Sequence, residues 1–274
     1  MQLLGALSLF MALFGVYLTS LYGYLMFHGL AEIFSIVIAC GIFMVGWNAR
    51  GFLQSHYLLF IGIAYLYVGG IDLLHTLAFK GMGVFDGYDA NLPTQLWVGG
   101  RYLQAISLLF ATFFIRRRLR PPRVFLGYSI ATGLFLASIF YWKIFPDCFV
   151  EGVGLTPFKI FSEYIICLIL LASIGLLLKN AREFDRDVLF FLVGSLLAAI
   201  ASELAFTTYL SVYGFANLVG HLLKIVSFYL IYRAIIETGL VSPYKLLFWD
   251  LKQSEEALWK AHDELEEKVA ERTL

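Results

Sequence analysis

Three apolar stretches of this chain each contain a pair of ionisable side chains at helical spacing, and each pair includes a histidine. The pairs are His28 with Glu32, Asp72 with His75, and His221 with Lys224. Residues three or four apart lie on one face of a helix, so the two members of each pair point the same way. Ionisable groups within membrane helices usually face a protein interior or a cavity and mark function. We therefore expect three helices to share one ligand site.

The residue types in this expected site suit three classes of ligand. Imidazole and carboxylate groups bind zinc, copper or iron, so a metal ion is one option. Its expected ligands are His28, Glu32, His75 and His221. A haem with two imidazole ligands is the second option. The third is an anionic or quinone-like molecule held by Arg101, Lys224 and a histidine. The whole set of candidate ligand-binding residues is Asp72, His75, Gln95, Arg101, Glu203 and Lys224.

The same charged residues also allow a structural interpretation. Asp72 with Arg101, or Glu203 with Lys224, would form ion pairs that fix how neighbouring helices align, because intramembrane charges pair with one another. Two glycine pairs, Gly69–Gly70 and Gly99–Gly100, are expected to permit close helix packing.

The composition indicates which elements position these residues. Of 274 residues, 60% are hydrophobic and only 15% are charged, whereas about 25% of residues are charged in a soluble domain. Apolar runs of about 20 residues recur, which is the length that crosses a bilayer. The sequence therefore predicts an all-α, polytopic bundle of membrane helices in a lipid bilayer, since backbone groups in lipid must pair within a helix or a closed barrel. A net charge of zero gives no sign of nucleic-acid binding, and the three scattered cysteines form no disulfide framework.

Eight membrane spans are expected, and the first is interpreted as a retained span because no basic segment precedes it. The expected spans are Leu3–Leu21, His28–Trp47, Tyr57–Phe79, Leu96–Ile115, Val124–Trp142, Phe158–Leu178, Val188–Tyr209 and Leu218–Ile236.

The basic residues in the short loops predict the orientation of these spans. Five arginines lie between Arg116 and Arg123, and basic residues in short loops favour the cytoplasmic side. With that loop inside, both termini are cytoplasmic. The ionisable residues of the spans then fall within one layer in the outer half of the membrane. This layer contains His28, Glu32, Asp72, His75, Arg101, Glu163, Glu203, His221 and Lys224.

The chain changes character near its C-terminal end. Residues 1–239 form the expected membrane domain, and residues 240–274 are charged and helical in pattern. Leu251, Leu258 and Leu265 recur every seven residues, which predicts a short cytoplasmic coiled coil that joins two copies of the chain as a homodimer. Because the chain stops in mid-helix, we expect the natural protein to continue into an output module.

Several segments resemble a known family. DLLHTLAFKGMGVF, at residues 72–85, and ANLPTQLWVGGRYLQAISLL, at residues 90–109, are similar to the third class of bacterial membrane-associated sensor domains, the MASE type. FHGLAEIFSIVIACGIFMVGWNAR, at residues 27–50, fits as well, and the final ELEEKVAERTL resembles the helix that joins such sensors to output modules. The residues that match are His28, Glu32, Asp72, His75, Asn91, Pro93, Thr94, Gln95 and Arg101.

The resemblance implies a sensory domain in the bacterial cytoplasmic (inner) membrane, at the amino terminus of a sensor histidine kinase or a diguanylate cyclase. A response regulator would be the partner downstream. These 274 residues contain no kinase or cyclase motif, so no enzymatic activity is expected in them. The alternatives are a metal-dependent membrane enzyme, although no HExxH motif is present, and a transporter, although no internal repeat is apparent.

Overall fold

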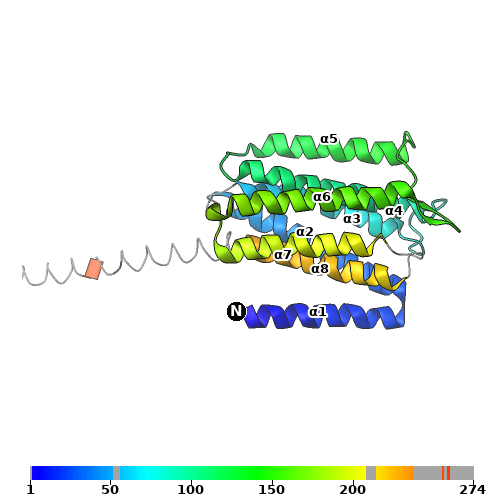
Figure 1. Cartoon of the computed structure of the whole chain (residues 1–274), viewed down its shortest axis with the longest axis horizontal. Coiled ribbons are helices and arrows are strands. Elements are labelled where there is room, and N and C mark those ends of the chain that lie inside the picture. Colours follow the sequence, from blue (N-terminus) through cyan, green and yellow to red (C-terminus); the bar gives the residue numbers. More distant parts are fainter. Residues whose placement is uncertain (1, 52–55, 208–213, 237–254, 256–257, 260–274) are drawn as a thin grey trace, which may run out of the picture.

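A computed structural model of the chain describes residues 2–51, 56–207, 214–236, 255, 258 and 259. Eight α-helices in this part of the chain lie side by side and form an elongated bundle (Figure 1). They are α1 (Gln2–Tyr22), α2 (Tyr24–Asn48), α3 (Tyr57–Ala78), α4 (Asn91–Ala111), α5 (Pro121–Phe140), α6 (Pro157–Lys179), α7 (Arg186–Ala205) and α8 (Phe215–Ile236). The expected all-α fold is therefore confirmed.

Six of the eight helices are long and apolar enough to cross a membrane: α2, α3, α5, α6, α7 and α8. Six of the eight expected spans therefore coincide with candidate membrane helices. The apolar part of α1, Leu7–Tyr22, is shorter. In α4 the polar residues Gln95, Arg101 and Gln104 lower the hydropathy, and all three are buried inside the bundle.

The bundle is organised around α3. Its apolar window is 72% buried, whereas that of α5 is 6% buried. Accordingly, α5 lies along one edge of the bundle and α1 along the opposite edge (Figure 1). A Cβ atom added at Gly69 of α3 would lie 3.1 Å from Ala39 Cβ of α2, and one at Gly100 would lie 3.2 Å from Ile71 Cγ2. The expected close packing is found at these two glycines and at Gly99, where a Cβ atom would overlap the ring of Phe135, but nothing lies within 4 Å at Gly70.

Several helix boundaries differ from the expectation by a few residues, and one loop contains strands that were not expected. Gly23 has an extended backbone and separates α1 from α2 by one residue only. The second helix therefore begins at Tyr24, and His28 lies in its second turn. The fourth helix begins at Asn91, five residues early, because Pro93 in the first turn removes no helical hydrogen bond. The loop between α5 and α6 contains a two-stranded antiparallel ladder, β1 (Phe149–Val150) and β2 (Gly154–Leu155), which the sequence did not predict.

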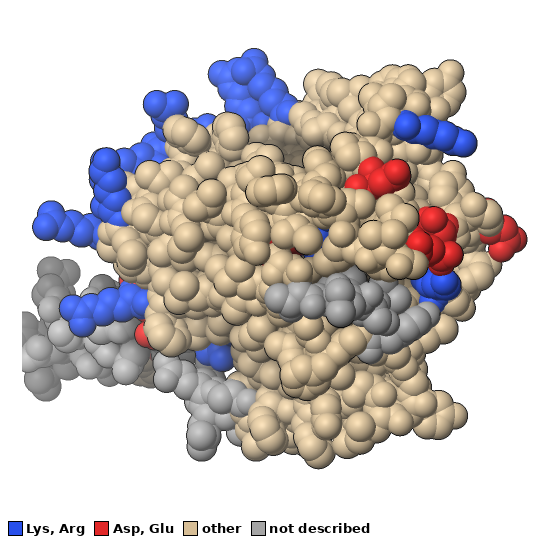
Figure 2. All heavy atoms as spheres, turned by 45° about the vertical axis from the view of Figure 1, so that its right-hand side comes forward, with Lys and Arg blue, Asp and Glu red and all other residues tan. Residues whose placement is uncertain are grey.

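Charged side chains divide between the two ends of the bundle. Most Lys and Arg side chains visible in Figure 2 lie at one end of the bundle, and most of the visible acidic ones lie at the other. We call the end that contains the loop between α4 and α5, with Arg116 to Arg123, the basic end. The predicted coiled coil and its dimer fall almost wholly outside the described residues, and within those residues no coiled coil is seen.

Candidate functional site

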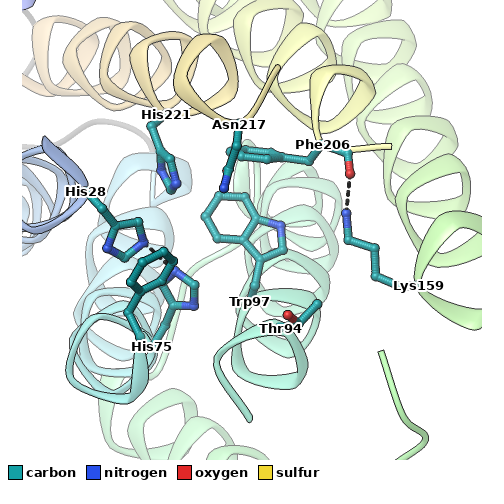
Figure 3. Close-up of a pocket in the computed structure, with 9 residues that line it drawn as sticks. His28, His75, Thr94, Trp97, Lys159, Phe206, Asn217 and His221 are labelled. Atoms are coloured by element: carbon teal, nitrogen blue, oxygen red, sulfur yellow. Dashed lines mark hydrogen bonds between the residues drawn. The ribbon is translucent and has the colours of Figure 1, made fainter. Parts of the chain in front are cut away.

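Three histidines from three helices meet around a small cavity toward the end of the bundle opposite the basic end (Figure 3). His28 of α2 and His75 of α3 approach to 3.2 Å between their Nε2 atoms, and the rings of His28 and His221 lie 4.8 Å apart. All three side chains are buried. The residues that line the cavity are His28, His75, Phe79, Thr94, Trp97, Lys159, Phe206, Asn217 and His221. The structure thus brings together the three histidines that the sequence analysis selected.

The hydrogen bond of His75 determines which of its ring nitrogens is free. Its Nδ1 lies 2.8 Å from the carbonyl oxygen of Pro93, and a carbonyl only accepts, so Nδ1 carries the proton. In the neutral imidazole, Nε2 then has a lone pair directed toward His28. Among the described residues, His28 Nδ1 has no hydrogen-bond partner.

Glu32 lies beside the histidines, with a nitrogen atom close to each of its carboxylate oxygens. Oε1 is 3.1 Å from His221 Nδ1, and Oε2 accepts a hydrogen bond of 2.6 Å from Lys224 Nζ. Glu32 is fully buried, and a buried carboxylate requires such partners because an unpaired charge is costly in a low-dielectric interior. His221 and Lys224 therefore attach α8 to α2 at this carboxylate.

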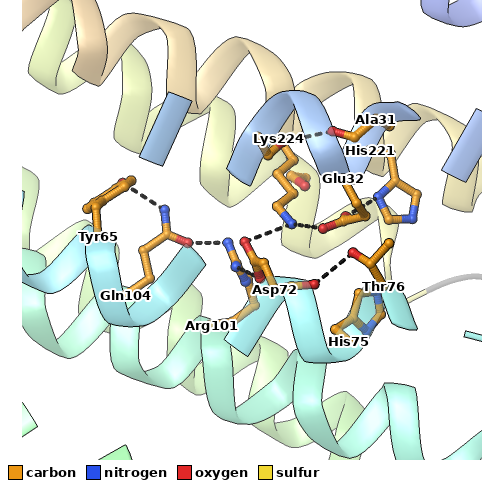
Figure 4. A network of polar contacts seen from close by, with 12 residues as sticks. Ala31, Glu32, Tyr65, Asp72, His75, Thr76, Arg101, Gln104, His221 and Lys224 are labelled. Atoms are coloured by element: carbon orange, nitrogen blue, oxygen red, sulfur yellow. Dashed lines mark hydrogen bonds and ion pairs between the residues drawn. The ribbon is translucent and has the colours of Figure 1, made fainter. Parts of the chain in front are cut away.

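A network of buried charges continues from Lys224 into the bundle (Figure 4). Lys224 Nζ also lies 3.0 Å from Asp72 Oδ2, and Arg101 donates to Asp72 Oδ1 at 2.5 Å. Arg101 also donates to Gln104, whose amide reaches the Tyr65 hydroxyl at 2.9 Å. The expected pair of Asp72 and Arg101 is confirmed.

The charged members of this network balance one another. They are Glu32, Asp72, Arg101 and Lys224, each no more than 2% exposed. Two carboxylates and two cations sum to zero, which suits a low-dielectric interior. Four helices, α2, α3, α4 and α8, each contribute one of these residues. The network therefore fixes how these helices align and stabilises one arrangement of them.

The alternative pair of Glu203 with Lys224 is not formed in the described part of the chain. Lys224 turns to Glu32 and Asp72 instead. Glu203, on α7, lies against Glu163 of α6. Glu163 in turn pairs with Lys159 at 2.9 Å. Glu163 and Glu203 thus belong to a second buried cluster, on the α6–α7 side of the bundle.

Gln95 and Asn91 act outside the cavity. The amide of Gln95 donates to the carbonyl oxygens of Phe145 and Pro146 at 3.1 and 3.0 Å. Asn91 Oδ1 accepts from the backbone N–H of Cys148 at 2.8 Å. Both residues therefore hold the loop between α5 and α6 against the start of α4.

Five residues that the sequence analysis did not select also line the cavity: Phe79, Trp97, Lys159, Phe206 and Asn217. Lys159 Nζ donates to the Phe206 carbonyl at 2.5 Å. A usable signal existed for Lys159 alone, since Lys159 and Glu163 have the i, i+4 spacing of a helical ion pair. The aromatic residues gave none, because the chain has 26 Phe and 16 Tyr and most of them simply pack.

The cavity limits which ligand fits the arrangement described. Its volume is about 30 Å³, counted as the space open to the centre of a water molecule. Counted in the same way, a cavity needs roughly 10–15 Å³ to hold one water molecule. An ion or a few waters fit this space, whereas a porphyrin or a quinone ring does not.

Comparison with protein families places most of the chain in one of them. Residues 19–243 match the MASE3 family, described as a membrane-associated sensor domain. Comparison with curated proteins and with solved structures found no match.

Proposed function

The chain belongs to the MASE3 family of membrane-associated sensor domains, and from this premise we propose that it senses a small ligand in the cavity where His28, His75 and His221 meet. A ligand that binds there would change the contacts of His28, His75 or His221. The resulting shift of α8 would pass along this helix to its far end. Sensing of this kind requires that the ligand bind two arrangements of the bundle with different affinity.

The observation that carries this proposal is the position of Lys224. This residue of α8 contacts Glu32 of α2 at 2.6 Å and Asp72 of α3 at 3.0 Å. His221, one turn before it on α8, lines the cavity and contacts the same Glu32. A change in the cavity therefore reaches the ion pairs that hold α8 against its neighbours.

We further propose that the basic end faces the cytoplasm and that all eight helices cross the membrane. Basic residues in short loops favour the cytoplasmic side, and α4 has its polar side chains buried, so that it can lie among the other spans. In this orientation the cavity lies in the outer half of the membrane, and α8 ends on the cytoplasmic side.

The output that we propose is a histidine kinase, with a response regulator as its partner, or a diguanylate cyclase. Two observations support this output. The chain belongs to a family of sensor domains, and the heptad spacing of Leu251, Leu258 and Leu265 suits a dimeric connector. The module itself would lie beyond residue 274.

The test is to measure the output of the full natural protein in membranes after Lys224→Met. Autophosphorylation and cyclic-di-GMP formation are assayed separately. We expect basal output to change at least about fivefold, which corresponds to roughly 1 kcal/mol, the lower end of measured coupling free energies. Lys80→Met is the control, because Lys80 and Glu151 form an exposed pair on the surface, each 54% exposed. A folded Lys224→Met protein with unchanged output would contradict the proposal.

A further inference from the structure

We infer that the ligand of the cavity is a transition-metal ion of the zinc class, bound by His28, His75 and Glu32, and that Lys224 competes with this ion for Glu32. This inference rests on the proposed function, because it names the ligand of the same cavity. One ligand atom from each of the three residues lies within 4.8 Å of the other two, and all three side chains are buried.

The distance between the two imidazoles matches that of two ligands on one ion. Zinc–nitrogen bonds of about 2.0–2.1 Å at a tetrahedral angle place two nitrogens about 3.3 Å apart. The Nε2 atoms of His28 and His75 are 3.2 Å apart. With His75 Nδ1 protonated, the lone pair of its Nε2 is available to a metal. In the absence of an ion, His28 Nε2–H donates to His75 Nε2. When an ion binds both Nε2 atoms, this proton moves to His28 Nδ1, which has no hydrogen-bond partner among the described residues, and α2 and α3 need little rearrangement.

The surroundings supply the outer contacts that metal sites use. Ligating histidines usually donate their second N–H to a carbonyl or a carboxylate, which fixes the orientation of the ring. His75 does so to Pro93, at 2.8 Å. His221 Nδ1 lies 3.1 Å from Glu32 Oε1, near enough to donate to this oxygen after a small adjustment. His221 also lines the cavity, so it is placed to support Glu32 or to complete the coordination.

The competition follows from the charges. Glu32, Asp72, Arg101 and Lys224 already sum to zero, so a divalent ion adds two uncompensated positive charges beside them. The positive charge nearest to Glu32 is Lys224, whose Nζ lies 2.6 Å from Oε2. An ion that draws Glu32 toward the histidines weakens this contact. The two arrangements, Lys224 on Glu32 and metal on Glu32, are the two states between which a sensor would switch.

The experiment measures the binding of Zn²⁺ alone to the purified 274-residue chain in detergent, after treatment with a chelator. Affinity and stoichiometry come from competition with a chromophoric chelator, and Co²⁺ serves as a spectroscopic probe of the coordination geometry. We expect one Zn²⁺ per chain. His28→Ala and His75→Ala should each lower the affinity by more than the roughly 10–100-fold that outer contacts contribute. His56→Ala is the matched control, since His56 precedes α3 at the basic end.

Lys224→Met separates a specific loss from misfolding. Removing the competing charge should tighten Zn²⁺ binding at least about tenfold, because like charges a few ångströms apart in a buried site repel strongly. A damaged fold would weaken binding instead. The inference is overturned if the wild-type chain binds no Zn²⁺, if the two histidine variants bind as the wild type does, or if Lys224→Met weakens binding. A different result would contradict the proposed sensing function, namely unchanged kinase or cyclase output of the Lys224→Met protein.

Discussion

Arg101 shows what a single residue contributes to this bundle. It is 2% exposed, donates to Asp72 and Gln104, and lies over the ring of Trp97 at 4.8 Å. Removing one partner of a buried ion pair leaves the other charge uncompensated, and that loss is larger than the net contribution of the pair itself.

Arg101→Leu is therefore expected to destabilise the chain by about 3–5 kcal/mol. Lys80→Met should cost no more than about 1 kcal/mol, since exposed ion pairs contribute little. Unfolding in mixed detergent, followed by circular dichroism, measures both. Equal stability of the two variants would mean that the buried network contributes no more than an exposed pair.

The same residues show how much of the site the sequence can predict. Asp72 and His75 could be identified as site candidates because ionisable residues are rare in apolar runs. The pairing of Asp72 with Arg101 could be predicted because the two residues lie on helices that follow each other in the chain. The partner of Lys224 was not predictable from spacing. Glu32 is 192 residues away, and which pairs of helices pack together is a property of the whole bundle.

At the scale of elements, the contact between α2 and α3 depends on a small residue. Gly69 faces Ala39 of α2, whereas its neighbour Gly70 has nothing within 4 Å. We expect Gly69→Leu to destabilise the chain by about 1–3 kcal/mol through overpacking, and Gly70→Leu to leave stability nearly unchanged. The midpoints of detergent unfolding compare the two directly. If both variants unfold alike, the close approach of α2 and α3 is not a source of stability.

The loop between α5 and α6 is held against α4 by Gln95 and Asn91, and Asn91 makes the contact with Cys148. Asn91 accepts hydrogen bonds from the backbone N–H groups of Cys148 and Phe149. Cys148 is fully buried, and burial raises the pKa of its thiol to about 12. Little of the reactive thiolate is therefore present near pH 8.

Asn91→Ala should expose this thiol and lower its pKa toward the ordinary value. In a chain with Cys40 and Cys167 replaced by alanine, maleimide labelling of Cys148 is then expected to speed up at least about tenfold at pH 8. Asn48→Ala, at the other end of the bundle, is the control, since the Asn48 amide donates to the Met44 carbonyl of its own helix. Equally slow labelling in both variants would show that Asn91 does not hold the loop.

The sequence determines that a helix is present better than it determines where the helix begins and ends. Apolar length alone located all eight helices. The early start of α4 was hidden because Asn91, Pro93 and Thr94 are common in loops and at helix starts. In the structure, Asn91 bonds to Asp147 of the α5–α6 loop and Thr94 to the Ala90 carbonyl. The ladder of β1 and β2 has two residues per strand, which is too short for a periodic pattern.

At the scale of the whole molecule, the division of charge between the two ends predicts how the chain sits in a membrane. If the basic end is cytoplasmic, Arg118 lies inside the cell and Glu151 lies outside. Both positions are exposed, so an introduced cysteine would be accessible at either. Single-cysteine variants Arg118→Cys and Glu151→Cys, made in a chain without its three native cysteines, are treated in intact cells with a membrane-impermeant maleimide. We expect labelling of Glu151→Cys alone, and labelling of both once the cells are opened.

The reverse pattern would place the three histidines in the inner half of the membrane and the end of α8 outside. That result would contradict transmission along α8 to a cytoplasmic output, even if the cavity bound its ion as proposed.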